Sequence, residues 1–190
     1  MSHGYIVASI EHTYEDGVVA FPDARVVPLS PTAGLYTKLG SPETHEWERG
    51  RDDVWATDVR FVLDQLSMLA TDRRQASRFF GRLDLSHIGV VGHSIGGRAV
   101  ARACQLDLRI KACANEDGYL TSDGPILIYK DATLPTQPFL FLQAFPQPVS
   151  DTLLASAHLT RQQFDQTLAD ARSSVKTELE RPGFRALQLY

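Results

Sequence analysis

The sequence predicts an α/β fold, a single domain over residues 1–190 with a mostly parallel sheet and helices on both of its faces. Two observations lead to this prediction. Short apolar runs of strand length alternate along the chain with helical patterns, which is the order of parallel crossover units. Residues 88–106 also pass from such a run through a glycine-rich turn into an alanine-rich helical pattern.

Five apolar runs have the length and composition of strands, because β-branched and aromatic residues are frequent in them. They cover residues 5–10, 87–92, 109–114, 138–144 and 184–190. The first run reads Tyr-Ile-Val-Ala-Ser-Ile, which is typical of a buried parallel strand. Residues 13–45 follow it with many glycines and prolines, and they are predicted to form a long surface loop.

Helical periodicity returns in three stretches, residues 46–69, 95–106 and 150–180. In the first stretch the apolar residues expected to face the core are Val54, Phe61, Val62, Leu66 and Leu69. The second begins directly after the glycine-rich turn. The third is polar and is ended by a Pro-Gly pair at residues 182–183.

The composition excludes several classes of partner. A formal net charge of -4 leaves no basic footprint for nucleic acid. No window approaches the roughly 18 apolar residues of a transmembrane segment, and no signal peptide is visible. Cys104 and Cys113 lack the spacing of a metal site and are expected to be two buried thiols, with a disulfide left open. Compartment and oligomeric state stay undetermined.

Gly92-His93-Ser94-Ile95-Gly96 matches the G-x-S-x-G pattern of a nucleophile elbow, with a predicted strand before it and a helix after it. Such a turn strains the backbone of the serine, and side chains at the flanking glycines would collide with their neighbours. We therefore expect Ser94 to be a nucleophile with an unusual backbone conformation. The backbone N–H of Ile95 would stabilise the oxyanion at the helix N-terminus.

The chain resembles the platelet-activating-factor acetylhydrolase family of α/β-hydrolases, the lipoprotein-associated phospholipase type and its microbial relatives. Three segments carry the resemblance in order: residues 2–12 (Ser-His-Gly-Tyr-Ile-Val-Ala-Ser-Ile-Glu-His), residues 92–97 around the elbow, and residues 116–119 (Glu-Asp-Gly-Tyr). The likeness extends from Ser2 to about Pro148. Dienelactone-hydrolase-like and polyester-hydrolase-like enzymes share parts of it.

This resemblance implies a carboxylic-ester hydrolase that forms an acyl-enzyme, needs no cofactor, and acts on a phospholipid-like or short-chain acyl ester. Asp117 matches the acid of the family's triad. Asp151 and Glu116 stay open as alternatives, although an N-cap would explain Asp151. A general carboxylesterase or polyester-hydrolase-like enzyme is the second reading, and a catalytically inert or binding chain is the third. Arg98 would either steer an anionic head group or lie solvated.

No histidine in the sequence fits the role of catalytic base. His158 is the only histidine after Asp117, and it is expected to be a solvated surface residue. In the family the catalytic histidine follows the final strand. We therefore expect a partial α/β-hydrolase domain that lacks N-terminal strands and the histidine loop, with negligible esterase activity by itself. The strands at 5–10 and 87–92 would then be directly paired or separated by a cleft.

Overall fold

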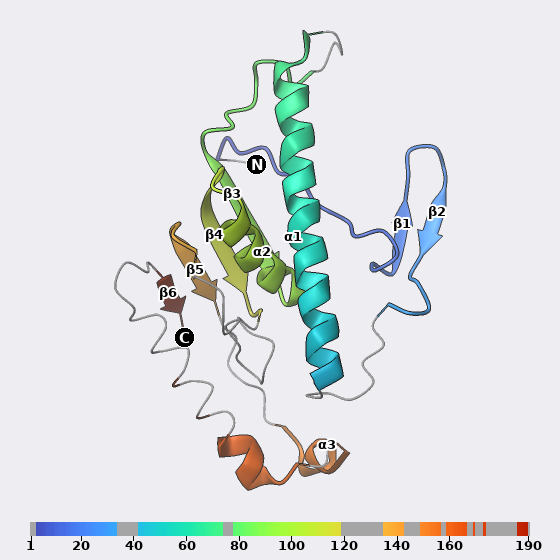
Figure 1. Cartoon of the computed structure of the whole chain (residues 1–190), viewed down its shortest axis with the longest axis vertical. Coiled ribbons are helices and arrows are strands. Elements are labelled where there is room, and N and C mark those ends of the chain that lie inside the picture. The colour runs from blue at the N-terminus through green and yellow to red at the C-terminus, as the bar shows by residue number, and fades with distance from the viewer. Residues whose placement is uncertain are drawn as a thin grey trace.

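A parallel sheet of four strands forms the centre of the computed structural model, which describes residues 3–33, 42–73, 78–118, 135–142, 149–156, 159–166, 169, 173 and 186–189. Its strands are β3 (Ile88–His93), β4 (Ile110–Glu116), β5 (Phe139–Leu142) and β6 (Ala186–Leu189), adjacent in that order (Figure 1). Every pairing between them is parallel. The α/β class with a parallel sheet is confirmed.

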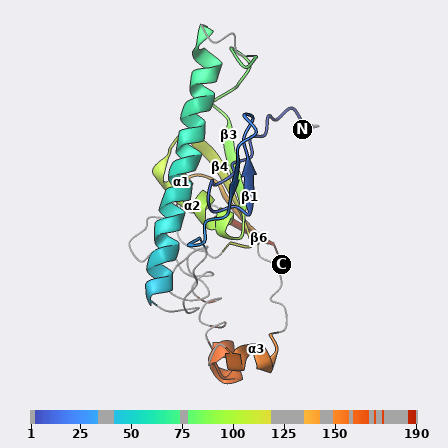
Figure 2. The ribbon, with the colours of Figure 1, turned by 90° about the vertical axis from the view of Figure 1, so that its right-hand side faces the viewer.

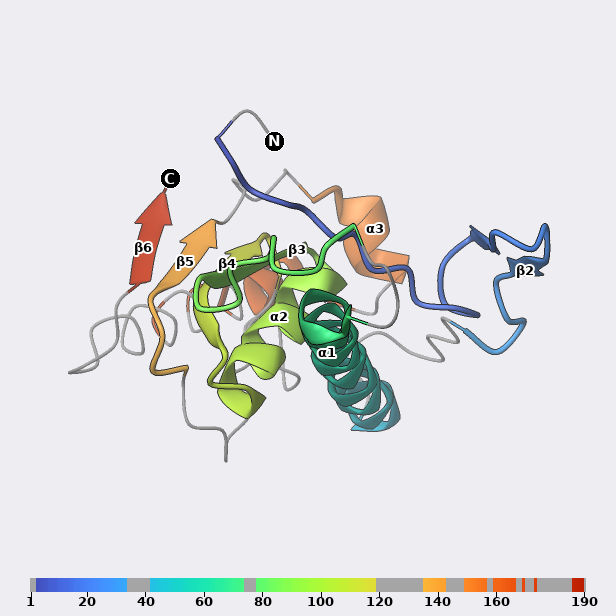
Figure 3. The same ribbon diagram turned by 90° about the horizontal axis from the view of Figure 1, so that it is seen from above.

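Two helices pack on one face of this sheet (Figure 3). Helix α2 (Ile95–Leu106) lies against β3 and β4, and the long helix α1 (Pro42–Thr71) packs along α2. A third helix, α3 (Asp151–Ser156), lies beyond one end of the sheet (Figures 1 and 2). Helices on both faces therefore stay a prediction. No described helix is long and apolar enough to cross a membrane.

The core lies between α1, α2 and the strands. Its small side chains on α2 and β4, such as Ala103 and Cys113, let helix and sheet approach closely. The buried members are Ala56, Val59, Leu63, Val100, Ala101, Ala103, Cys104, Ile110, Cys113, Phe139 and Phe141. Two of the core positions expected on α1 are wrong, because Val54 and Phe61 are 47% and 60% exposed. The buried stripe instead includes the small Ala56 and the charged Asp52, so apolar character alone misplaced these two positions.

The predicted first strand is also wrong. Residues 5–10 form no strand, and Tyr5, Ile6 and Val7 are 71%, 57% and 69% exposed. In the described sheet β3 has β4 as its neighbour, and residues 5–10 are not paired with it. A β-branched run becomes a strand only where a neighbour completes its hydrogen bonds, so the composition of this run could not decide its structure. Only Ile10 at its end packs against the core.

Part of the predicted loop is a small hairpin. Strands β1 (Val18–Ala20) and β2 (Val26–Pro28) are antiparallel, and their inward residues Val19 and Val27 are buried. The hairpin lies on the far side of α1 from the sheet (Figures 1 and 3). Its base is fixed to α1 by His12, whose ring stacks on Trp55 and whose Nδ1 lies 2.7 Å from Asp58.

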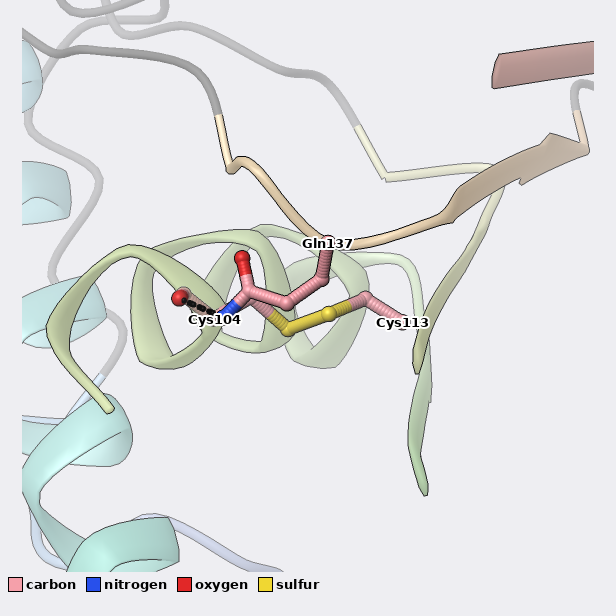
Figure 4. The surroundings of a disulfide bond; sticks show 3 residues. All are labelled: Cys104, Cys113 and Gln137. Atoms are coloured by element: carbon pink, nitrogen blue, oxygen red, sulfur yellow. Dashed lines mark hydrogen bonds between the residues drawn. A yellow bond between two sulfur atoms is a disulfide. The ribbon is translucent and has the colours of Figure 1, made fainter. Parts of the chain in front are cut away.

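Cys104 on α2 and Cys113 on β4 form a disulfide (Figure 4). Both residues are buried, as expected, but the expectation of two separate thiols is wrong. No spacing rule could decide the pairing from sequence, since a disulfide requires the two residues to face each other at a short Cα–Cα distance. Here the helix packs directly on the strand and brings them to 6.6 Å.

Candidate active site

Ser94 occupies the turn between β3 and α2, at the carboxyl edge of the sheet. Its backbone has φ 54° and ψ -122°, and its side chain is exposed. A positive φ is rare for a residue with a side chain and marks a strained position. The turn itself is held from within, because the N–H groups of Gly97 and Arg98 donate to the Ser94 carbonyl at 3.0 and 3.3 Å. The expected backbone conformation of Ser94 is confirmed.

Two glycines make this turn sterically feasible. A Cβ on Gly92 would lie 2.3 Å from the carbonyl oxygen of Gly96. A Cβ on Gly97 would lie 2.3 Å from Oδ1 of Asn115 on β4. Real carbon atoms do not approach so closely, so both positions require glycine. Gly96 itself has open space, so the last glycine of the motif is not required by its neighbours.

Asp117 lies beside Ser94 at the same edge of the sheet. In the parallel pairing of β3 with β4, Gly92 is opposite Asn115 and His93 is opposite Glu116, so Ser94 and Asp117 follow as the next residues of neighbouring strands. The Ser94 N–H donates to the Glu116 carbonyl at 2.8 Å. Asp117 has φ 55° and donates its N–H to the Leu142 carbonyl at 2.6 Å.

The two alternative acids have different surroundings. Glu116 is exposed at the last position of β4. Asp151 is the first residue of α3, and its carboxylate lies 2.5 Å from Nη2 of Arg161. An ion pair and a helix N-terminus account for Asp151 without catalysis. The sheet thus places Asp117 next to Ser94 along neighbouring strands, while Asp151 is engaged by Arg161.

Ile95 is the first residue of α2, so its N–H has no acceptor within the helix. The residue directly after the serine of a nucleophile elbow is the one whose N–H the α/β-hydrolase motif uses as an oxyanion donor. Two described histidines are engaged elsewhere, His12 with Asp58 and His87 with Asp84. His158 lies outside the described residues.

Arg98, on the first turn of α2, is only 8% exposed, so the expectation of a solvated or head-group-binding residue is wrong. Its Nε and Nη2 donate to Oδ2 of Asp52 at 3.1 and 2.9 Å, and Nη1 lies 3.4 Å from Glu48. This buried ion pair joins the first turn of α2, directly after Ser94, to α1. Among the described residues no cluster of side chains could hold a metal ion.

A strand-to-helix turn with a strained serine between required glycines is the nucleophile elbow of the α/β-hydrolase class. Comparisons with known proteins point the same way. The chain is 27% identical to platelet-activating factor acetylhydrolase of Cavia porcellus over 80% of its length and 36% of that protein. It is 30% identical to a probable 1-alkyl-2-acetylglycerophosphocholine esterase of Arthroderma benhamiae over 65% of its length and 26% of that protein. The predicted resemblance to platelet-activating-factor acetylhydrolases is confirmed.

The chain spans about a third or less of the length of these curated relatives. A ferulic acid esterase structure from Streptomyces cinnamoneus aligns with a TM-score of 0.47 at 28% identity, covering 79% of this chain and 38% of that one. No family model matches the chain.

Proposed function

We propose that this chain carries the nucleophile and the acid of a serine carboxylic-ester hydrolase. The backbone of Ser94 is the observation that supports the proposal most directly, because φ 54° in a Gly-x-Ser-x-Gly turn is a strained geometry that a purely structural turn does not need. The similarity to two ester hydrolases of phospholipid type supports it independently.

The reaction would proceed through an acyl-enzyme. The Ser94 hydroxyl oxygen adds to the ester carbonyl carbon while a general base accepts its proton. The carbonyl oxygen becomes an oxyanion and accepts a hydrogen bond from the Ile95 N–H. The C–O bond to the alcohol then breaks, and the alcohol leaves with the proton from the base. A water molecule, deprotonated by the same base, then attacks the acyl-enzyme carbonyl carbon. The bond to Ser94 breaks, which releases the carboxylic acid and returns the proton to Ser94.

Asp117 would orient the base and stabilise its charged form. In this mechanism the base is a histidine. Alanine variants of each histidine in the protein from the complete reading frame would assign the role. No cofactor takes part in these steps.

The substrate we propose is a phospholipid-like ester with a short acyl chain, such as a 1-alkyl-2-acetyl-glycerophosphocholine. The name of the Arthroderma relative describes such a substrate.

The test uses the protein encoded by the complete reading frame that contains these 190 residues. We expect a fluorophosphonate to label it at Ser94, and the acetyl phospholipid to be hydrolysed. Ser94→Ala should abolish labelling and hydrolysis. Ser86 is an exposed serine just before β3, and the matched control Ser86→Ala should retain both activities. Labelling that survives Ser94→Ala would contradict the proposal. A protein that cleaves a short chromogenic ester but not the phospholipid would refute the substrate only.

A further inference from the structure

Asn115 is a buried polar residue between the nucleophile and the proposed acid. It is on β4, two residues before Asp117, and its exposed fraction is 0%. An amide in the interior of a strand that otherwise packs on α2 costs free energy unless it forms hydrogen bonds.

The side chain of Asn115 contacts both turns of the site. Its Oδ1 accepts a hydrogen bond from the Gly118 N–H at 2.8 Å, which closes the turn that contains Asp117. The same oxygen lies against Gly97 on the elbow, where a Cβ would come within 2.3 Å of it. The carboxamide of Asn115 therefore lies between the turn that contains Asp117 and the turn that contains Ser94, and contacts both.

Gly118 completes this contact from the other side. A Cβ on Gly118 would lie 2.4 Å from the Ser94 carbonyl oxygen and 2.6 Å from Oδ1 of Asn115. The backbone of the acid turn is thus pressed directly against the backbone of Ser94. Any displacement of Gly118 would move Asp117 and Ser94 relative to each other.

The second polar atom of Asn115 is unusual. Its Nδ2 is buried and has no hydrogen-bond acceptor among the residues that the structure describes. An unsatisfied buried donor costs about 1–3 kcal/mol, so Nδ2 does not stabilise the fold. What the carboxamide contributes is the contact of its Oδ1 with Gly118 and Gly97.

We propose that Asn115 is a positioning residue, which sets the distance between Ser94 and Asp117 by holding the Gly118 N–H on one side and packing on Gly97 on the other. The effect of Asn115 on the reaction rests on the proposed function. Its role in spacing the two turns does not depend on that function. Asn115 does not contact the reacting atoms. Its effect on the reaction is transmitted through the two backbones.

The chain offers a matched control. Gln137 is also a buried carboxamide, 8% exposed, and it likewise forms one hydrogen bond to the main chain, from Nε2 to the Cys104 carbonyl at 2.7 Å (Figure 4). Its Oε1 also lacks a donor among the described residues. It lies at the opposite end of α2 from the elbow, so its loss should affect stability without affecting the site.

The experiment compares Asn115→Leu, Asn115→Asp and Gln137→Leu in the protein from the complete reading frame. The first readout is amide hydrogen exchange at Gly118 and Ser94, and the second is the rate of fluorophosphonate labelling. Asn115→Leu should speed exchange at both amides by about tenfold or more and slow labelling by a similar factor, as loss of one buried hydrogen bond allows. Gln137→Leu should change neither by more than about twofold.

Asn115→Asp keeps an acceptor oxygen at the same distance from the main chain. It should restore the protection of Gly118, and it is the variant to examine if Asn115→Leu does not fold. Unchanged exchange at Gly118 and Ser94 in Asn115→Leu would overturn the proposal, and so would an equal loss in Gln137→Leu. If the unmodified protein is not labelled at all, the proposed function fails, while the exchange data still decide the positioning role.

Discussion

The elbow region, residues 88–118, and the N-terminal region, residues 5–33, have similar amounts of apolar sequence but are held in different ways. In the elbow region the main chain is closely packed: a Cβ on Gly92 or Gly118 would meet backbone oxygen, and one on Gly97 would meet the Asn115 side chain. The Ser94 N–H also donates to the Glu116 carbonyl on the next strand. In the N-terminal region residues 5–9 are exposed, and the chain is held by side-chain contacts of His12. The sequence therefore predicts the steric requirements of a short motif directly. It does not predict whether an isolated apolar run will find a strand to pair with.

The largest effect should come from adding one methyl group at the elbow. Gly92→Ala places a carbon 2.3 Å from the Gly96 carbonyl oxygen, and both atoms are fixed by backbone. We expect the free energy of unfolding to fall by about 3 kcal/mol or more, because the turn must open to admit the side chain. Urea unfolding followed by circular dichroism measures this change.

Gly96→Ala is the control for this prediction. It adds the same methyl group four residues later, where nothing lies within 4 Å. Inside the first turn of α2 alanine should be neutral or stabilising, by up to about 1 kcal/mol. Equal losses in both variants would show that the elbow is not sterically determined.

The disulfide should have the next largest effect. It joins the C-terminal part of α2 to β4. It closes a short ring, since the two cysteines are 9 residues apart. A ring of this size stabilises a fold by about 2–3 kcal/mol in the chain-entropy description. We expect a reductant to lower the free energy of unfolding of the natural protein by that amount, which shows as a lower urea midpoint.

The double variant Cys104→Ala/Cys113→Ala should start from the lower midpoint and not respond to reductant. A reductant-insensitive midpoint in the natural protein would mean that the thiols are separate, as the sequence alone suggested. Protection of the hairpin amides at residues 18–28 should be unaffected in either case, because the hairpin does not contact this bond.

A smaller, pH-dependent effect is expected at Asp107, where α2 ends and leads into β4. Hydrogen bonds from Arg109 lower the pKa of its carboxyl below the ordinary value of 3.8, and burial opposes them only in part. Because the folded pKa is the lower one, the stabilisation is complete above the unfolded pKa and is lost as the pH falls through the folded pKa. Asp107→Asn should cost about 1–2 kcal/mol at neutral pH and progressively less as the pH falls through the folded pKa of the carboxyl.

Asp64→Asn is the matched control, because Asp64 bonds the same arginine at 2.7 Å but is 59% exposed. It should cost under about 0.5 kcal/mol at any pH, as exposed ion pairs do. A loss at Asp107 that does not diminish as the pH falls would mean that packing, and not the charge, is responsible.

The sequence predicted the elements that local rules determine. The strand, turn and helix around Ser94 follow from the spacing of three glycines, and α2 begins and ends where its pattern does. Asn115 was not found, although a polar residue directly after the apolar run 109–114 and before Asp-Gly was a signal for it. The burial of Arg98, the face of α1 and the disulfide all depend on which surfaces meet, and no periodicity within one element contains that information.

The smallest expected effect gives the clearest contrast between the two regions. Ile6 is 57% exposed in the N-terminal segment, whereas Ile88 on β3 packs against the core. Both isoleucines stand in runs that read as buried strands, so sequence alone predicts the same cost for a polar replacement. From the structure, Ile6→Ser should change the free energy of unfolding by no more than about 0.5 kcal/mol, and Ile88→Ser should lower it by about 1–3 kcal/mol. Urea unfolding of the two variants under the same conditions decides the matter. Equal losses would mean that residues 5–10 are buried in solution and form the strand that their composition predicts.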